Sequence, residues 1–234
     1  IRAAAATMKE GYTLVINPKK ISDPEYVFEA LSQYIDIPKE DFLLRVNKDD
    51  QYEEIKKRLS KEVGISIQNL KIDGVYLVKD NWRVYPGGKT ASQTIGITGY
   101  GNDGKIAGRY GLESYYENIL GRSLNSKKIN FFAELFSDIK NSFVSFDQKT
   151  GDIVTSIDPA IQGYVEDILS KTKNTWKSDY IGAIVMNPND GQIFAMASLP
   201  SFDPNNLKDI DDPKVFSNPL VENVYEMGSI IKPI

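Results

Sequence analysis

The sequence predicts an α+β fold, and three patterns along the chain support this prediction. Short apolar runs, of which residues 12–16 are an example, predict β-strands. Apolar residues that recur three and four positions apart, as they do in residues 27–34, predict helices with one buried face. Two further apolar runs between residues 180 and 198 are joined by a Pro-Asn-Asp-Gly turn, which predicts an antiparallel hairpin.

The N-terminal third is expected to contain one strand, two helices and then a pair of strands. The strand over residues 12–16 ends at an Asn-Pro pair, and the first helix begins behind Asp23 and Pro24. A second apolar stripe predicts the second helix, and its members are Ile55, Leu59 and Val63. The pair of strands is expected at residues 74–78 and 82–85, before a Pro-Gly-Gly stop.

The middle of the chain predicts a connector and two more helices. The glycine-rich stretch of residues 99–111 resembles a dinucleotide-binding fingerprint, but no long helix directly follows it. We therefore interpret it as a flexible connector. Apolar stripes within residues 112–120 and 132–143 predict two helices, the first of which is closed by Gly121.

The style of the sequence changes near residue 150. Asp158 is a favourable N-cap residue and Pro159 suits the first helical position, so a helix is expected to begin there. Its buried stripe is expected to consist of Ile161, Val165, Ile168 and Leu169. The hairpin follows this helix, and residues 199–219, which are rich in Pro and Asn, are expected to form a surface loop.

The composition excludes several classes of site. The chain of 234 residues contains no histidine and no cysteine. It therefore cannot form a Ser-His-Asp triad, a histidine-ligated zinc site, a thiol nucleophile or a disulfide. The 28 basic and 32 acidic residues are spread along the chain with a formal net charge of −4, so we expect no nucleic-acid partner. No apolar run approaches the roughly 18 residues of a membrane-spanning helix, so the chain as given is expected to be soluble and trimmed from a longer protein.

Nucleophilic catalysis can still rest on a Ser-x-x-Lys pair. The motif occurs three times, about as often as chance predicts, at Ser137/Lys140, Ser170/Lys173 and Ser229/Lys232. The chemistry needs the serine at a helix N-terminus and the lysine one turn later on the same face, where it accepts the hydroxyl proton. The first two pairs lie late in their expected helices, where the lysine complements the C-terminal dipole. Ser229 follows a glycine and precedes two isoleucines, an apolar setting that suits a basic lysine, although an ordinary helix start remains the alternative.

Residues 225–234, Tyr-Glu-Met-Gly-Ser-Ile-Ile-Lys-Pro-Ile, resemble the active-site serine motif of class B penicillin-binding proteins, the peptidoglycan D,D-transpeptidases. Residues 156–162 are similar to the start of the family's transpeptidase domain, and residues 182–205 to its first hairpin and the following loop. Residues 83–86 and 111–116 are similar to signatures of its N-terminal pedestal region. These similarities occur in the family's order over most of the chain.

The resemblance implies a two-domain organisation. An elongated, non-catalytic pedestal or dimerisation domain of strands and helices would cover residues 1–155. The N-terminal part of a β-lactamase-like serine transpeptidase domain would cover residues 156–234, with its first helix and antiparallel hairpin. In that domain the resemblance assigns Ser229 as the catalytic nucleophile and Lys232 as its general base.

Two features depart from the family pattern. Met227 replaces the usual proline and Ile230 the usual threonine, while Ser229 and Lys232 are in place. The sequence also stops two residues after Lys232, before the family's Ser-x-Asn and Lys-Thr-Gly elements. The second of these would supply half of the oxyanion hole and recognise the substrate carboxylate. We therefore expect the polypeptide of residues 1–234 alone to be inactive.

For the whole protein the resemblance implies crosslinking of peptidoglycan stem peptides. Ser229 would attack the penultimate D-Ala carbonyl and release the terminal D-Ala, and an amine of a neighbouring stem peptide would then resolve the acyl-enzyme. β-Lactams would acylate the same serine, and no metal or organic cofactor is expected. A single anchor in the bacterial cytoplasmic membrane would precede Ile1, with the catalytic part outside the cell membrane. The pedestal would contact a membrane glycosyltransferase of the shape, elongation, division and sporulation type, and a homodimer is a further candidate assembly.

Two other functions stay open. Residues 1–155 could act only as a protein-interaction module, or the chain could belong to another Ser-Lys acyl enzyme, such as a β-lactam sensor or a β-lactamase relative. A stable β-lactam adduct would indicate a transpeptidase or a sensor, and rapid turnover would indicate a β-lactamase. The absence of any reaction would indicate the interaction module.

Overall fold

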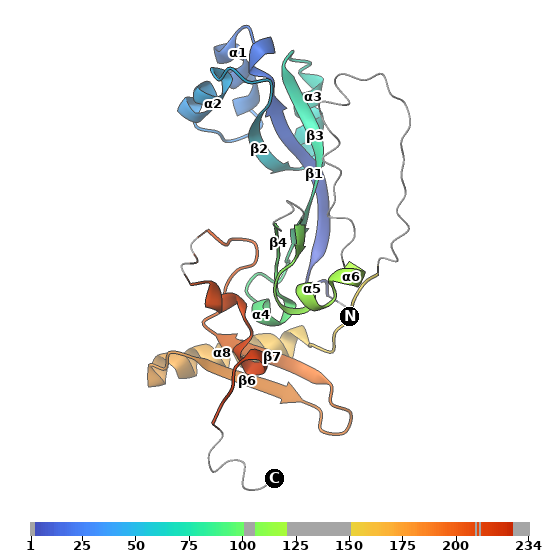
Figure 1. Cartoon of the computed structure of the whole chain (residues 1–234), viewed down its shortest axis with the longest axis vertical. Coiled ribbons are helices and arrows are strands. Elements are labelled where there is room, and N and C mark those ends of the chain that lie inside the picture. The colour runs from blue at the N-terminus through green and yellow to red at the C-terminus, as the bar shows by residue number, and fades with distance from the viewer. Residues whose placement is uncertain (1–2, 101–105, 121–150, 209, 211, 227–234) are drawn as a thin grey trace. The chain divides into compact units, whose positions relative to one another are not determined.

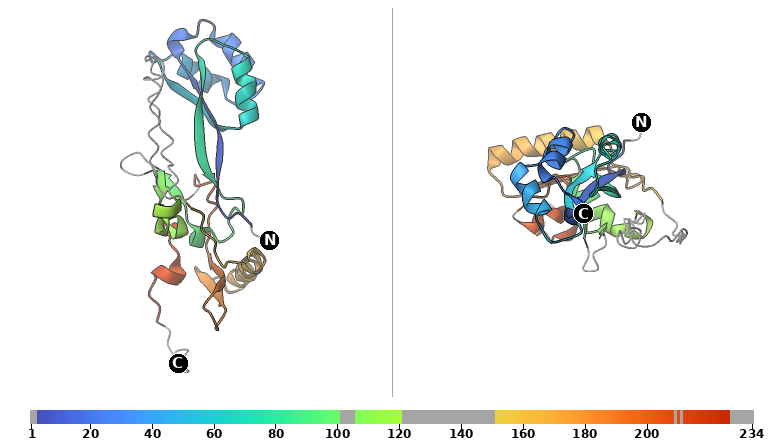
Figure 2. Two further views of the ribbon diagram at one scale, coloured as in Figure 1. Left: turned by 90° about the vertical axis from the view of Figure 1, so that its right-hand side faces the viewer. Right: turned by 90° about the horizontal axis from the view of Figure 1, so that it is seen from above.

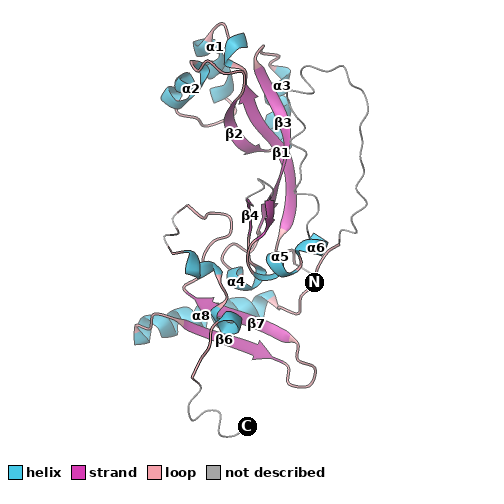
Figure 3. Cartoon of the chain, in the orientation of Figure 1, coloured by secondary structure: helices cyan, strands magenta, loops and turns pink. Residues whose placement is uncertain are grey.

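The protein is a mixture of helices and small sheets, as predicted (Figure 1; Figure 3). The computed structural model describes residues 3–100, 106–120, 151–208, 210 and 212–226. The contacts between residues divide the chain into two compact units, one of residues 8–83 and one of residues 84–234 together with residues 1–7.

The unit of residues 8–83 is built on a three-stranded sheet with the strand order β2-β1-β3. Its strands are β1 (Thr7–Ile16), β2 (Glu53–Leu59) and β3 (Val75–Val84). The central strand β1 contains the predicted strand and runs antiparallel to β2, with Tyr12 opposite Leu59 and Ile16 opposite Glu53.

Three helices accompany this sheet, and two of them begin at side-chain caps. The helices are α1 (Pro24–Ser32), α2 (Lys39–Val46) and α3 (Lys61–Asn69). The Asp23 carboxylate accepts a hydrogen bond from the Tyr26 N–H at 3.1 Å, and the Ser60 hydroxyl accepts one from the Val63 N–H at 3.3 Å. Such caps pair N–H groups that the first helical turn leaves free. The predicted helix start at Asp23 and Pro24 is confirmed.

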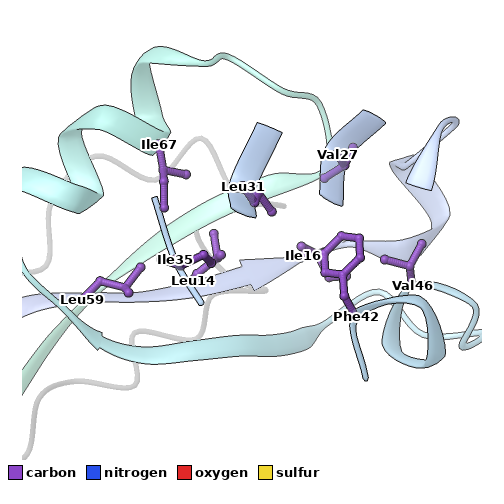
Figure 4. Packing of buried hydrophobic residues seen from close by; sticks show 9 residues of the cluster. All are labelled: Leu14, Ile16, Val27, Leu31, Ile35, Phe42, Val46, Leu59 and Ile67. Atoms are coloured by element: carbon purple, nitrogen blue, oxygen red, sulfur yellow. The ribbon is translucent and has the colours of Figure 1, made fainter. Parts of the chain in front are cut away.

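The core of this unit gathers around β1. Leu14 and Ile16 are fully buried, and they share one face of the strand because they are two positions apart. Val27 and Leu31 of α1 and Phe42 of α2 belong to the same cluster (Figure 4). The unit therefore has a hydrophobic core of its own.

The helix predicted from Ile55, Leu59 and Val63 is wrong. Residues 53–59 form β2, and α3 begins only at Lys61. A spacing of four residues fits both one face of a helix and alternate positions of a strand, so Ile55 and Leu59 could not distinguish the two.

The predicted pair of strands between residues 74 and 85 is instead one continuous strand, β3. Its polar centre looked like a turn in the sequence. In the fold, the Asp80 carboxylate accepts a hydrogen bond from Thr13 Oγ1 at 3.0 Å, so a tertiary contact satisfies a group that a turn would have exposed. Helix α2 was not predicted, because only Phe42 and Val46 mark its buried side.

The second unit begins with short elements: α4 (Ser92–Ile95), β4 (Thr98–Tyr100), β5 (Ile106–Gly108), α5 (Gly111–Tyr115) and α6 (Glu117–Leu120). The expected flexible connector is wrong where it is described, because β4 and β5 pair antiparallel with Thr98 opposite Gly108. The helix expected at residues 112–120 is interrupted at Tyr116, which has φ −106° and ψ 24°. Gly121 and the stripe in residues 132–143 lie outside the described residues.

The helix and hairpin predicted after residue 150 are confirmed. They are α8 (Pro159–Trp176), β6 (Ile181–Met186) and β7 (Ile193–Leu199). The Asp158 carboxylate accepts hydrogen bonds from the N–H groups of Ala160 and Ile161 at 2.8 and 3.0 Å. In the turn between the strands, Gly191 has a φ of +74°, which a glycine adopts without steric cost.

The buried face of α8 differs from the predicted stripe. Val165 and Leu169 are buried against Ala195 and Ala197 of β7, as Figure 2 shows from the side. Gln162 is also fully buried, whereas Ile161 and Ile168 are 36% and 42% exposed. The buried side therefore runs through a polar residue, which a stripe of apolar residues could not predict.

The surface loop expected at residues 199–219 is more ordered than predicted. It contains the 3₁₀ helix η2 (Pro213–Phe216) and ends at the short helix α9 (Pro219–Glu222). Phe202 is only 3% exposed, and its ring packs edge-on against Phe216 with 5.0 Å between the centroids. Across the described parts of the chain, no helix combines the length and apolar character needed to cross a bilayer.

The core of the first unit can be tested with two leucines that differ in burial. Leu31 on α1 is fully buried, and Leu44 on α2 is 69% exposed. We predict that Leu31→Ala lowers the free energy of unfolding of this unit by about 2–5 kcal/mol, because it removes buried methyl groups and leaves a cavity. Leu44→Ala should change it by less than about 0.5 kcal/mol. Denaturant unfolding would measure both, and equal effects would contradict the described core.

Candidate active site

Ser229 and Lys232 lie outside the described residues, as do Met227 and Ile230. The structure describes the elements that precede them in the chain: α8, the β6–β7 hairpin and α9. It also describes the α4 segment, which contacts them. The geometry of this support is the part of the site that can be built from the structure.

The edge of β7 that faces away from β6 is bound by side chains and by an irregular segment. In the described part of the chain, β7 pairs with β6 alone. Gln162 Oε1 accepts a hydrogen bond from the Met196 N–H at 2.8 Å, and Gln162 Nε2 donates one to the Met196 carbonyl at 3.1 Å. The Asp158 N–H donates to the Phe194 carbonyl at 2.9 Å. The side-chain amide of Gln162 thus does what a neighbouring strand would do, and an exposed strand edge is avoided.

Glu166, one helical turn after Gln162, extends this network to the α4 segment. Its Oε1 accepts a hydrogen bond from Gln162 Nε2 at 2.7 Å and another from the Ala91 N–H at 2.8 Å. Ala91 is buried and has a φ of +52°, a left-handed conformation that is uncommon for alanine. Bonding to Glu166 holds the backbone of Ala91 in this conformation just before α4.

Gln93 on α4 fastens the loop that follows β7 at two points. It is only 6% exposed. Its Nε2 donates to the carbonyls of Pro200 at 2.8 Å and Val215 at 3.3 Å, and its Oε1 accepts a hydrogen bond from Ser198 Oγ at 2.8 Å. All of the hydrogen-bonding capacity that Gln93 shows here is directed to the end of β7 and to the loop, so one side chain fixes where the loop leaves and returns.

Helix α9 packs on the face of the hairpin opposite to α8. Ile181 and Ala183 pack with the α8 cluster, so Gly182 between them points to the other face. A Cβ atom at Gly182 would lie 2.6 Å from Leu220 Cδ2, which shows how closely α9 approaches the strand. The Tyr225 hydroxyl donates a hydrogen bond to the Pro219 carbonyl at 2.7 Å and so ties the chain after α9 back to the helix start.

Comparison with known proteins adds two family matches. The profile described as "Penicillin-binding Protein dimerisation domain" matches residues 3–151, more than half of the chain. The profile described as "Penicillin binding protein transpeptidase domain" matches residues 181–234. The chain belongs to the class B penicillin-binding proteins. The resemblance that the motifs indicated is thereby confirmed.

Individual relatives support the same family. The chain is 30% identical, over 95% of its length, to the peptidoglycan D,D-transpeptidase FtsI of Buchnera aphidicola subsp. Schizaphis graminum, and 29% identical, over 98%, to the stage V sporulation protein D of Bacillus subtilis. It spans only 38% and 35% of these two relatives. A crystal structure of penicillin-binding protein 2X from Streptococcus thermophilus has a similar fold, with a TM-score of 0.57 and 17% identity over 89% of this chain and 34% of that one.

The junction around α4 crosses the boundary between the two matches of this penicillin-binding protein. Gln93 and Ala91 lie in the part matched by the dimerisation profile, whereas Ser198 lies in the part matched by the transpeptidase profile. All three belong to the same compact unit. The residues after Val84 therefore support the transpeptidase segment directly.

The second of the three Ser-x-x-Lys pairs behaves as predicted. Lys173 lies in the last turn of α8, and its Nζ donates hydrogen bonds to the carbonyls of Ser178 and Asp179 at 2.5 and 3.0 Å. It therefore satisfies carbonyl groups beyond the helix end. On the solvent side of α8, the neighbouring Asp167 carboxylate raises the pKa of the Lys171 ammonium by a hydrogen bond of 2.5 Å and by charge attraction. The first pair, Ser137/Lys140, lies outside the described residues.

The sequence reasoning missed most of the residues that build the support. Gln162 was noticed only as part of a motif, and Gln93 was not singled out at all. No local signal marks Gln93, because its partners are more than 100 residues away in the chain. Asn218 could have been found, because Asn followed by Pro is a typical N-cap and first helical residue.

Gln162 offers a sharp test of the β7 edge. We predict that Gln162→Ala lowers the free energy of unfolding of the second unit by about 2–4 kcal/mol, because it leaves the buried N–H and carbonyl of Met196 without their amide partner. Gln68→Ala is the matched control, since Gln68 is an exposed helical glutamine on α3, and it should have almost no effect. Thermal unfolding followed by circular dichroism would measure both, and a neutral Gln162→Ala would contradict the edge-binding role.

Proposed function

We propose that this protein is a peptidoglycan D,D-transpeptidase that crosslinks stem peptides through an acyl-enzyme on Ser229. One observation carries the proposal: the two family profiles follow each other in order, and the transpeptidase profile includes the Ser-x-x-Lys pair at Ser229 and Lys232. Relatives named peptidoglycan D,D-transpeptidase, from Buchnera and from Escherichia coli, support it.

In the proposed reaction, the Ser229 hydroxyl attacks the carbonyl carbon of the penultimate D-Ala of a stem peptide. Lys232 accepts the hydroxyl proton, and the peptide bond to the terminal D-Ala breaks as that D-Ala leaves with a proton on its amine. An amine of a second stem peptide then attacks the Ser229 ester, which forms the crosslink and restores the serine. A β-lactam would acylate Ser229 by the same attack, and its opened ring would remain attached.

The elements in the described residues would act as the support of this reaction. The hairpin and α8 form a packed layer, and α9 is held on that layer a few residues before Tyr225. We further propose that residues 1–155 form the non-catalytic domain and residues 156–234 the start of the catalytic one. The polypeptide of residues 1–234 alone should not turn over substrate, because no Lys-Thr-Gly element is present after Lys232 to complete an oxyanion hole.

Location and partners follow from the same proposal. We propose that the protein works outside the bacterial cytoplasmic membrane on a single anchor, and that its pedestal contacts a membrane glycosyltransferase. The description of the profile that matches residues 3–151 also favours a homodimer. Light scattering on the purified protein would distinguish a homodimer from a monomer.

The decisive experiment uses the product of the complete gene and a penicillin. We expect incubation to add the mass of one penicillin to the protein, and peptide mapping to place the adduct on Ser229. Ser229→Ala should abolish the adduct. Ser170→Ala, which removes the serine of another Ser-x-x-Lys pair, should leave it unchanged.

Other results would lead to other functions. An adduct that forms and is rapidly hydrolysed would indicate a β-lactamase relative. An adduct on another residue, or none at all on the complete protein, would overturn the proposal in favour of an interaction module.

A further inference from the structure

Asn218 stands at the point where three parts of the second unit meet. It is only 5% exposed. Its Oδ1 accepts a hydrogen bond from the Leu220 N–H at 3.1 Å and so caps α9, while its own N–H donates to Glu222 Oε1 at 2.8 Å. Its Nδ2 faces Met196 Sδ of β7 at 3.2 Å and Thr94 Oγ1 of α4 at 3.4 Å. A single side chain thus contacts α9, β7 and α4.

A helix cap alone does not require an asparagine at this position. Serine, threonine and aspartate cap helices about equally well, because each offers an oxygen to the first-turn N–H groups. Among the preferred N-cap residues, only asparagine also presents an N–H₂ group, and here that group points at β7 and α4 instead of at solvent. The amide end of Asn218 therefore has a task that capping does not explain.

Thr94 and Met196 are themselves joined, so Asn218 attaches to a fixed point. Thr94 Oγ1 donates a hydrogen bond to the Met196 carbonyl at 3.2 Å, and the same carbonyl accepts one from Gln162. Helix α9 is short, with four residues, and it would have little stability without tertiary contacts. Its remaining close contact on the sheet is Leu220 against Gly182.

We propose that Asn218 is a positioning residue for the acylation of Ser229. Its amide holds α9 against β7 and α4, and thereby sets the place from which the chain continues through Tyr225 to the serine eleven residues after Asn218. Part of the segment matched by the dimerisation profile, Thr94, would in this way contribute to the rate of the chemical step. This inference rests on the proposed function of Ser229.

The test separates the cap from the attachment by using the product of the complete gene. Asn218→Ser keeps an oxygen that can cap α9, but it lacks the amide that reaches Met196 and Thr94. Asn218→Ala removes both. Asn205→Ala is the matched control, because the Asn205 amide also joins this unit to the chain just before α4, by hydrogen bonds to the N–H and carbonyl of Tyr85 at 3.0 and 2.8 Å, without touching α9.

Acylation would be followed with a fluorescent penicillin over a range of concentrations, at a temperature where circular dichroism shows every variant to be folded. This separates the dissociation constant of the non-covalent complex from the first-order acylation constant. We expect Asn218→Ser to lower the acylation constant between about 10- and 100-fold, because small misplacements of reacting groups have effects of this size. The dissociation constant should change less, and Asn205→Ala should leave both constants near those of the unmodified protein.

Each outcome has a definite meaning. An Asn218→Ser protein that is acylated at the normal rate would show that only the cap matters and would overturn the inference. An equal loss in Asn218→Ser and Asn205→Ala would show a general loss of structure and would also overturn it. An unmodified protein that is not acylated at all would instead refute the proposed function, and the positioning role with it.

Discussion

The outer edge of β7 is bound by side-chain amides, and the rest of the second unit depends on this edge. Gln162 takes both backbone groups of Met196 from the α8 side, and Thr94 shares the same carbonyl from α4. Because these groups are buried, their hydrogen bonds cannot be replaced by water without a local opening of the structure. The strand edge thus fixes three elements at once: the helix on one face, the α4 segment at the end, and α9 on the other face through Asn218.

Polar contacts at such a junction confer direction more than net stability. An apolar contact tolerates sliding, whereas an amide that binds both groups of one residue allows a single register. Gln93 extends this principle to the loop after β7, because it binds the carbonyls at both ends of the loop and the Ser198 hydroxyl. Each of these groups would be costly to leave unpaired, so the arrangement is expected to be retained as a whole or lost as a whole.

The organisation of the unit has a consequence for a class B penicillin-binding protein. Residues 84–120 fall within the dimerisation profile, yet they pack in one compact unit with α8 and the hairpin, while residues 8–83 form a unit with a separate core. A force or partner acting on the segment near α4 would therefore reach the hairpin through hydrogen bonds within one body. That is a physical basis on which a region outside the catalytic motif can bias the catalytic segment.

The sequence by itself determined the elements whose signals are local. Asp158 and Pro159 begin α8 because a carboxylate cap and a fixed proline φ act within one turn, and the Pro-Asn-Asp-Gly turn sets the hairpin because Gly191 adopts a positive φ. The motif order also identified the family, and with it Ser229 and Lys232 as site residues. Tertiary structure alone decided whether residues 53–59 became a strand, since their spacing fits both periods. It also decided the roles of Gln93, Gln162 and Asn218, because a hydrogen bond between residues far apart in the chain leaves no trace in the pattern around either of them.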